Sequence, residues 1–126
     1  MLSNIIDDTE ILYRAIPDNP NMWKPEINRP SSAIFKDERG VSVDRDGGRS
    51  EQQIIDDFQN RWPDRGIVSI LTKTCREIGT EPIAKPEDDN IYHAEIYDND
   101  GSPKIKRSKL KKMRDAAIVV KLPIFN

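Results

Sequence analysis

The strongest constraint on the fold is that short apolar runs typical of strands outnumber helical segments. Residues 50–62 place apolar side chains at helical spacing behind a serine that can cap the helix, and residues 108–117 show a narrower apolar face. Strand patterns occupy four stretches: 10–16, 66–72, 91–97 and 118–125, and we expect the last to be buried beside residues 67–72. Residues 81–86 contain two prolines and predict a short edge strand. Because strands cluster beside helices instead of alternating strictly with them, the sequence predicts an α+β fold. We expect a single mixed, mostly antiparallel sheet of five to seven strands with two helices packed on it.

The middle of the chain predicts a hairpin and a long loop. Residues 32–36 and 41–44 flank a charged turn that ends at Gly40, a spacing compatible with a hairpin. Residues 17–30 contain four prolines and several asparagines, so we expect a loop anchored by Trp23. The 126 residues fit a single domain spanning 1–126, with residues 1–9 as a polar lead-in that we expect to fray.

Cysteine and histidine usage excludes several classes of site. With one cysteine and one histidine, no internal disulfide and no His/Cys zinc site can form within one chain, and we expect no metal and no cofactor. No apolar run reaches the roughly 18 residues that span a bilayer, so we expect no membrane contact. The N-terminal residues lack the basic and apolar regions of a signal peptide, and a cytoplasmic location follows as the default.

Charge is distributed unevenly along the chain. The net charge is −2, yet residues 101–126 carry eight Lys or Arg and one acid, whereas residues 1–100 carry twelve against twenty-one. Such asymmetry suggests a basic contact surface for nucleic acid. No nucleic-acid motif is present and no aromatic residue interrupts the basic run, so a solvated helix face is the simpler alternative. The predicted nucleic-acid surface comprises Lys106, Arg107, Lys109, Lys111 and Lys112.

A second set of polar residues could support chemistry. His93 and Glu95 stand two apart on one face of a predicted strand, and Arg14 lies among apolar neighbours on another. A histidine titrates near neutrality and can act as a general acid or base. The predicted catalytic residues are His93, Glu95, Arg14 and Ser32. The predicted phosphate-binding residues, chosen for hydroxyls and guanidiniums beside glycine turns, are Ser31, Ser42, Arg45 and Arg49.

Three of these residues occur in an order that is similar to ADP-ribosyltransferases of the Arg/Ser/Glu type. Arg14 lies on a first strand, Ser32 follows in the Ser31-Ser32 pair, and Glu95 lies on a later strand. The resemblance implies that Arg and Ser support NAD and that Glu aids transfer. The chain departs from that pattern because it lacks the Ser-Thr-Ser triplet and carries His93 where a Glu or Gln precedes the catalytic Glu. A small metal-independent RNase is an alternative enzyme.

The sequence leaves open whether the chain is an enzyme. The leading hypothesis is a small domain that recognises a phosphate-bearing partner, nucleic acid or nucleotide, with catalysis centred on His93 as an extension. The alternative is a protein-interaction module, such as an inhibitor, antitoxin or assembly subunit, whose acidic residues 1–100 bind a basic protein partner. The sequence sets no oligomeric state.

Overall fold

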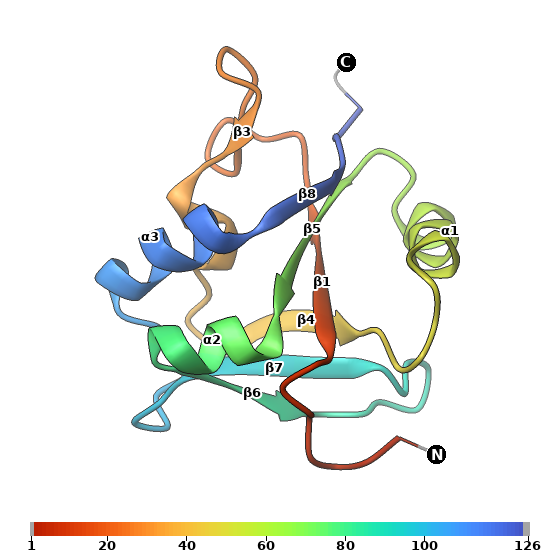
Figure 1. The fold of residues 1–126 in the computed structure, drawn as a ribbon. Helices are drawn as coiled ribbons and strands as arrows, with labels where there is room; N and C mark the ends of the chain where they lie inside the picture. The colour runs from red at the N-terminus through yellow and green to blue at the C-terminus, as the bar shows by residue number, and fades with distance from the viewer. Residues whose placement is uncertain (1, 125–126) are drawn as a thin grey trace.

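A computed structural model describes residues 2–124 as an α+β fold with a six-stranded antiparallel sheet, a separate two-stranded hairpin and three α-helices (Figure 1). The predicted fold class is therefore confirmed. The sheet order is β6-β7-β4-β1-β5-β8. The elements are β1 (Ile11–Ile16), β2 (Trp23–Lys24), β3 (Arg29–Pro30), the 3-10 helix η1 (Ser32–Phe35), β4 (Val41–Arg45), α1 (Glu51–Arg61), β5 (Gly66–Leu71), α2 (Thr72–Ile78), β6 (Thr80–Ala84), β7 (His93–Asp98), α3 (Arg107–Ala116) and β8 (Ile118–Lys121).

Helices cover both faces of the sheet. Adjacent residues on β1 point to opposite faces, so Leu12 packs into one apolar cluster and Tyr13 into another. The larger cluster lies under η1, α2 and α3, and it includes the buried Phe35 and Met113. The smaller cluster lies under α1 on the opposite face, as the separation of α1 from α2 and α3 in Figure 1 shows. Each face therefore has its own apolar core.

The predicted hairpin of residues 32–36 and 41–44 is wrong in its first half. Residues Ser32–Phe35 form η1, and β4 pairs with β1 and β7 instead. The Ser31 hydroxyl accepts a hydrogen bond from the Ala33 N–H at 3.1 Å and thereby begins a helical turn. Consecutive Ile34 and Phe35 are both fully buried in the same apolar cluster. A helical turn permits this, whereas a strand would direct the two side chains to opposite faces.

The two sheet edges differ in character. β6 lies at one edge, as the prolines predicted, and contains Pro82, which has no N–H to offer. β8 pairs with β5 as expected but forms the other edge, where Ile118 is 67% exposed. The expected burial of this strand is therefore not observed. The pairing of β8 with β5 is irregular between Ile67 and Val68, and Phe125, the last residue of the predicted strand, lies outside the described residues.

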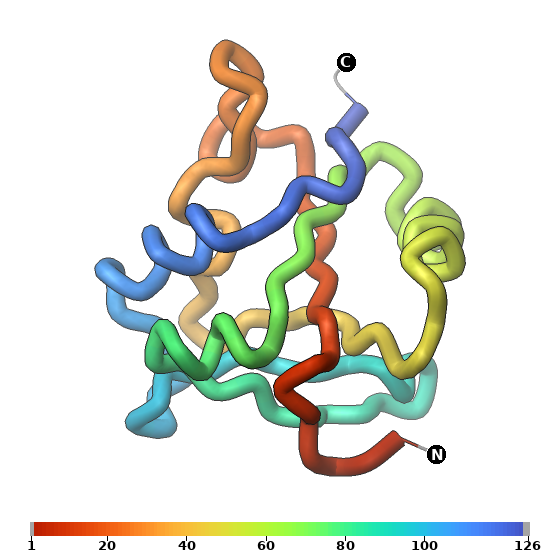
Figure 2. Tube along the Cα trace, in the orientation of Figure 1, coloured from red at the N-terminus to blue at the C-terminus, as the bar shows by residue number. Residues whose placement is uncertain are grey.

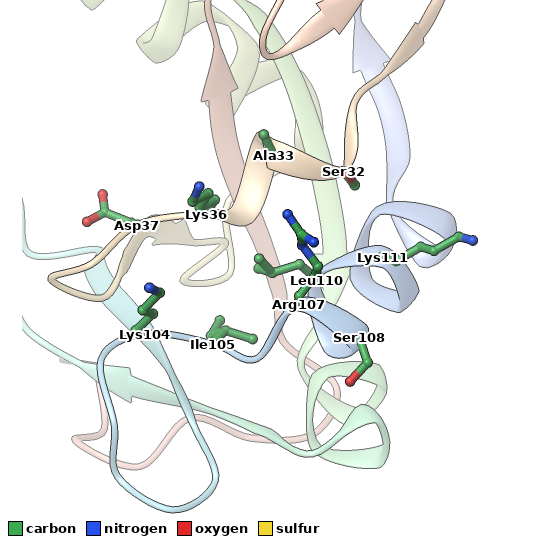
Figure 3. Close-up of a pocket in the computed structure, with 10 residues that line it drawn as sticks. All are labelled: Ser32, Ala33, Lys36, Asp37, Lys104, Ile105, Arg107, Ser108, Leu110 and Lys111. Carbon is green, nitrogen blue, oxygen red and sulfur yellow. The ribbon is translucent and has the colours of Figure 1, made fainter.

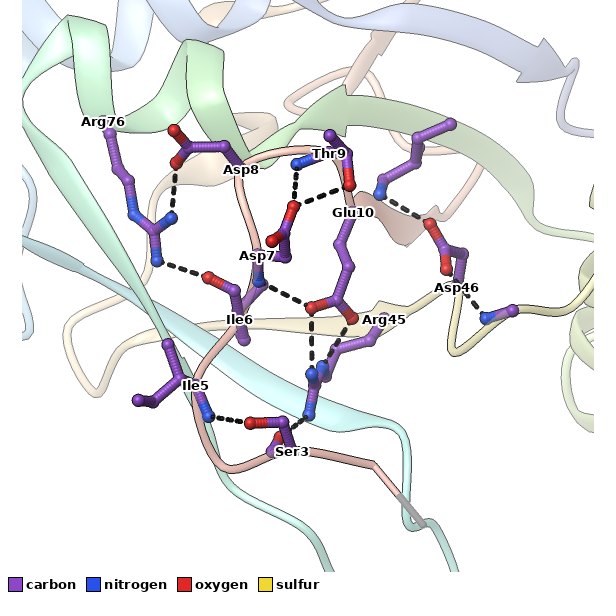
Figure 4. Close-up of polar contacts among 12 residues, drawn as sticks. Ser3, Ile5, Ile6, Asp7, Asp8, Thr9, Glu10, Arg45, Asp46 and Arg76 are labelled. Carbon is purple, nitrogen blue, oxygen red and sulfur yellow. Dashed lines mark hydrogen bonds and ion pairs between the residues drawn. The ribbon is translucent and has the colours of Figure 1, made fainter.

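Two segments outside the sheet are held by polar contacts. The loop of residues 17–30 contains the β2–β3 hairpin, which stands out from the body in Figure 2, and Trp23 is its buried anchor. The N-terminal lead-in is tied down by arginines from elsewhere in the chain (Figure 4). Arg45 donates to the Ser3 carbonyl at 2.7 Å, and Arg76 donates to the carbonyl of the buried Ile6 at 2.7 Å.

A buried ion pair attaches α3 to the end of β7. Asp98 is 1% exposed and accepts hydrogen bonds from Lys109 Nζ at 2.6 Å and from the Lys106 N–H at 3.0 Å. Burial alone would raise the pKa of Asp98, but these bonds outweigh it and hold the pKa below its ordinary value. The stabilisation is therefore present above the unfolded pKa and is lost as the pH falls through the folded one.

We expect Asp98→Asn to lower the free energy of unfolding by about 2 kcal/mol at neutral pH, because it weakens a charged hydrogen bond in a buried site. The difference from the wild type should shrink below about pH 4, where the unfolded carboxyl protonates. Urea unfolding at several pH values measures both effects. Asp88→Asn, at an exposed position, is the control. A deficit that stays constant from neutral to acid pH would contradict this role of Asp98.

Candidate functional site

A groove lies between the start of α3 on one side and η1 with the loop that follows it on the other (Figure 3). We call it the basic groove. Its volume is about 840 Å³. The lining residues are Ser32, Ala33, Lys36, Asp37, Lys104, Ile105, Arg107, Ser108, Leu110 and Lys111.

Cations dominate the charge of the basic groove. Four of the lining side chains are basic and one, Asp37, is acidic. Lys36, Arg107 and Lys111 form no ion pair with any residue between 2 and 124, and Lys104 lies 4.0 Å from the exposed Glu38. In Figure 3 Arg107 extends from α3 toward η1. An anion entering this groove would therefore meet cations that the chain itself leaves unneutralised.

The floor and rim of the groove limit what can bind there. Ala33, Ile105 and Leu110 supply an apolar floor, and Ser32 and Ser108 supply hydroxyls. None of the residues that line the groove is aromatic. Stacking of nucleobases on side chains is thus not offered, and recognition there would depend on charge and hydrogen bonds to phosphate.

The structure separates the five basic residues predicted as a nucleic-acid surface. Arg107 and Lys111 line the groove, and Lys106 is exposed at the N-cap of α3. Lys112 lines a different cavity, beside α2. Lys109 instead donates to Asp98 and to the Gly79 carbonyl at 2.9 Å. Its ammonium is committed to holding α3 against the sheet, so we leave it out of the basic groove.

A second cavity, the His93 cleft, lies under α1 beside β1, β4 and β7. Its volume is about 440 Å³. It brings together three of the predicted site residues, Arg14, Ser42 and His93, with Asp44 between them on β4. Its remaining lining residues are Tyr13, Ala15, Val43, Phe58, Arg61, Trp62, Glu87, Asp89 and Asn90.

Arg14 is fixed by backbone carbonyls at one wall of the His93 cleft. Its Nε donates to the Ile34 carbonyl at 2.6 Å and its Nη1 to the Ser42 carbonyl at 2.7 Å. Burial disfavours the charged guanidinium and lowers the pKa of Arg14 from its ordinary value. The group nevertheless stays charged at neutral pH because the ordinary arginine pKa is so high.

Both carboxylate oxygens of Asp44 accept hydrogen bonds within the protein, whereas one ring nitrogen of His93 has no partner among the described residues. Asp44 accepts hydrogen bonds from Arg61 at 2.7 Å and from the Asn90 side chain at 2.9 Å. His93 Nδ1 lies 2.9 Å from the Lys85 carbonyl oxygen. A carbonyl oxygen can only accept, so the neutral ring carries its proton on Nδ1 and presents Nε2 as an acceptor.

The remaining predicted site residues do not converge with these. Ser32 lines the basic groove, not the His93 cleft, and Glu95 accepts a hydrogen bond from the Tyr97 hydroxyl at 2.6 Å. Arg14, Ser32 and Glu95 therefore do not line one cavity, as an ADP-ribosyltransferase-like arrangement would require.

The three other residues predicted to bind phosphate instead make hydrogen bonds, ion pairs or ring contacts within the protein. Ser31 caps η1 and donates to the Asn21 carbonyl. Arg45 is 3% exposed and pairs with Glu10 at 2.9 Å. Arg49 lies 3.5 Å above the Tyr92 ring and donates to the Arg45 carbonyl at 2.8 Å. Each guanidinium thus has internal partners before any ligand arrives.

Sequence reasoning missed Lys36 and Lys104 in the groove and Arg61 in the cleft. Lys36 was assigned to a predicted strand and turn, and only the fold places it opposite α3. Arg61 follows Asp57 by one helical turn and donates to it at 2.8 Å, a spacing that the sequence does display. Its longer reach to Asp44 depends on tertiary packing.

Two searches of the described residues, for metal-ligand clusters and for membrane-spanning helices, gave no candidates. No group of three or more His, Cys, Asp or Glu side chains there is placed to hold a metal ion. None of the three described helices is both long and apolar enough to cross a membrane.

Comparisons with models of protein families, with curated proteins and with solved structures find no match. The two cavities are therefore the basis for assigning a function.

Cys75 is unsuited to nucleophilic chemistry, and its reactivity provides a test. The residue is fully buried, and burial raises the pKa of its thiol to about 12. We expect no labelling by a thiol reagent at mildly alkaline pH unless the protein opens, because the thiolate is the reactive form. Labelling followed by mass spectrometry, with denatured protein as the control, measures this. Rapid labelling of the folded chain would contradict the burial of the Cys75 side chain on α2.

Proposed function

We propose that this chain recognises a phosphate-bearing partner, in the first instance a nucleic acid, through the basic groove. The observation that carries the proposal is the set of groove cations without counter-ions: Lys36, Arg107 and Lys111. When such cations neutralise phosphates, the counterions condensed on the nucleic acid are released into solution, and this release gives a salt-dependent affinity. The excess of basic residues in 101–126 is consistent with the same surface.

The groove favours contact with the phosphate backbone over reading of bases. It offers lysines, an arginine and two serine hydroxyls, all of which donate to phosphate oxygens. It offers no aromatic platform. We therefore infer binding with little sequence preference. The apolar floor made by Ile105 and Leu110 would accommodate the sugar edges of a strand.

We expect binding to a fluorescent RNA or DNA oligonucleotide that weakens with salt. If all four basic side chains of the groove contact phosphates, the slope of log K against log salt should be about −3 on a single strand. Fluorescence anisotropy at low and moderate salt, with single- and double-stranded probes, measures the affinity and the slope.

Arg107→Glu with Lys111→Glu should abolish binding at moderate salt and flatten the slope, because repulsion replaces two phosphate contacts. The matched control reverses two exposed, unpaired cations outside the groove, Lys24→Glu with Lys73→Glu, and changes the net charge equally. An equal loss of oligonucleotide affinity in both variants would show that net charge, and not the groove, accounts for the binding. No wild-type binding at low salt would overturn the proposal.

A further inference from the structure

The His93 cleft combines hydrogen-bonding atoms that the protein leaves unused. Among the described residues, His93 Nε2 and the Ser42 hydroxyl have no hydrogen-bond partner, while His93 Nδ1 is held by the Lys85 carbonyl. Arg14 uses Nε and Nη1 on carbonyls and keeps Nη2 free. The cleft therefore offers one acceptor, His93 Nε2, and one donor, the Ser42 hydroxyl.

Strand register brings the acceptor and the hydroxyl within reach of a single ligand. His93 on β7 is paired with Asp44 on β4, and Ser42 lies two residues before Asp44 on the same face. Such diagonal neighbours in an antiparallel pair have Cα atoms about 7–8 Å apart, a gap that a small ring can bridge. The walls are partly apolar, because Phe58, Trp62 and Ala15 also line the cleft.

Charge at the cleft disfavours an anion. Two arginines, Arg14 and Arg61, face three carboxylates, those of Asp44, Glu87 and Asp89. Arg61 is already paired with Asp44 at 2.7 Å and with Asp57 at 2.8 Å. Asp89 has no cationic partner between residues 2 and 124. A phosphate would meet unpaired acid here, in contrast to the basic groove.

We propose that the His93 cleft binds a small, uncharged, planar group that carries an N–H donor beside a C=O acceptor. His93 Nε2 accepts from the ligand N–H, and the Ser42 hydroxyl donates to the ligand carbonyl. The imide edge of a uracil ring and a simple cyclic imide such as succinimide share this chemistry. The site lies on the opposite face of the sheet from the basic groove and is independent of the proposed function.

The single histidine makes the test direct, because the ring nitrogens of a ¹⁵N-labelled sample give one assignable pair of signals. The free protein should show the Nδ1–H tautomer. Titration with uridine, and separately with succinimide, should shift the Nε2 signal toward that of a hydrogen-bonded acceptor. Binding of both probes identifies a general imide site, and binding of uridine alone identifies a nucleobase site.

Two ligand controls isolate the proposed contacts. 3-Methyluridine and N-methylsuccinimide keep the ring but lose the N–H, and each should bind at least about tenfold more weakly, since the ligand would cover His93 Nε2 without giving it a hydrogen bond. Uridine monophosphate should shift the His93 ring signals at no lower concentration than uridine does, because the cleft is acidic; this readout reports on the cleft alone, since the phosphate would also bind in the basic groove. A His93 shift that saturates at lower concentrations of the monophosphate would overturn the charge argument and the proposal with it.

Ser42→Ala should weaken uridine binding several-fold without unfolding the protein, since Ser42 is exposed, and Ser108→Ala in the basic groove should leave it unchanged. Any of three results would overturn the proposal. The first is an Nε2–H tautomer in the free protein, and the second is equal affinity for methylated and unmethylated probes. The third is the absence of a His93 shift with either imide at its solubility limit.

Discussion

The arrangement of this molecule depends on how the central strand β1 is paired. All six residues of β1 pair with β5, but only Leu12 and Tyr13 pair with β4. Beyond that point Arg14 replaces the missing ladder, because its guanidinium bonds the Ser42 carbonyl of β4 and the Ile34 carbonyl of η1. Charge-assisted bonds of this kind contribute about 1.5–3 kcal/mol each. One arginine thus holds η1, a wall of the basic groove, and β4, a wall of the His93 cleft.

The sequence predicted those elements whose signals are local. The capping box at the start of α1 was readable from Ser50 and Gln53, and both of its hydrogen bonds are present, at 3.2 and 2.8 Å. Alternation along β7 was also readable: Ala94 and Ile96 are buried, and His93 and Glu95 are not. The sequence likewise predicted α+β architecture and the edge position of β6. In each case the signal, a regular repeat of apolar residues or a helix-capping side chain, involves residues that are close together in the sequence.

Features that depend on distant partners could not be predicted. Lys109 and Lys111 look equivalent in the basic run, yet only the fold places Asp98 and the Gly79 carbonyl around Lys109. Arg45 was assigned to phosphate because no local feature shows that Glu10 pairs with it. The sequence could name the residue types of a site, and of these Arg14, Ser42 and His93 do meet in one cleft. It could not show which cations remain unneutralised, since that depends on every carboxylate that packs nearby.

The edges of the sheet bear on how the chain behaves in a crowded solution. An open edge with a regular ladder can add strands from other molecules and nucleate aggregation. Here β6 is interrupted by Pro82, and β8 is four residues long, irregularly paired and followed by Pro123. Exposed Ile118 and Val119 therefore lie on an edge whose shortness and following proline disfavour the addition of another strand. The same features oppose edge-to-edge aggregation at a place where apolar side chains are exposed.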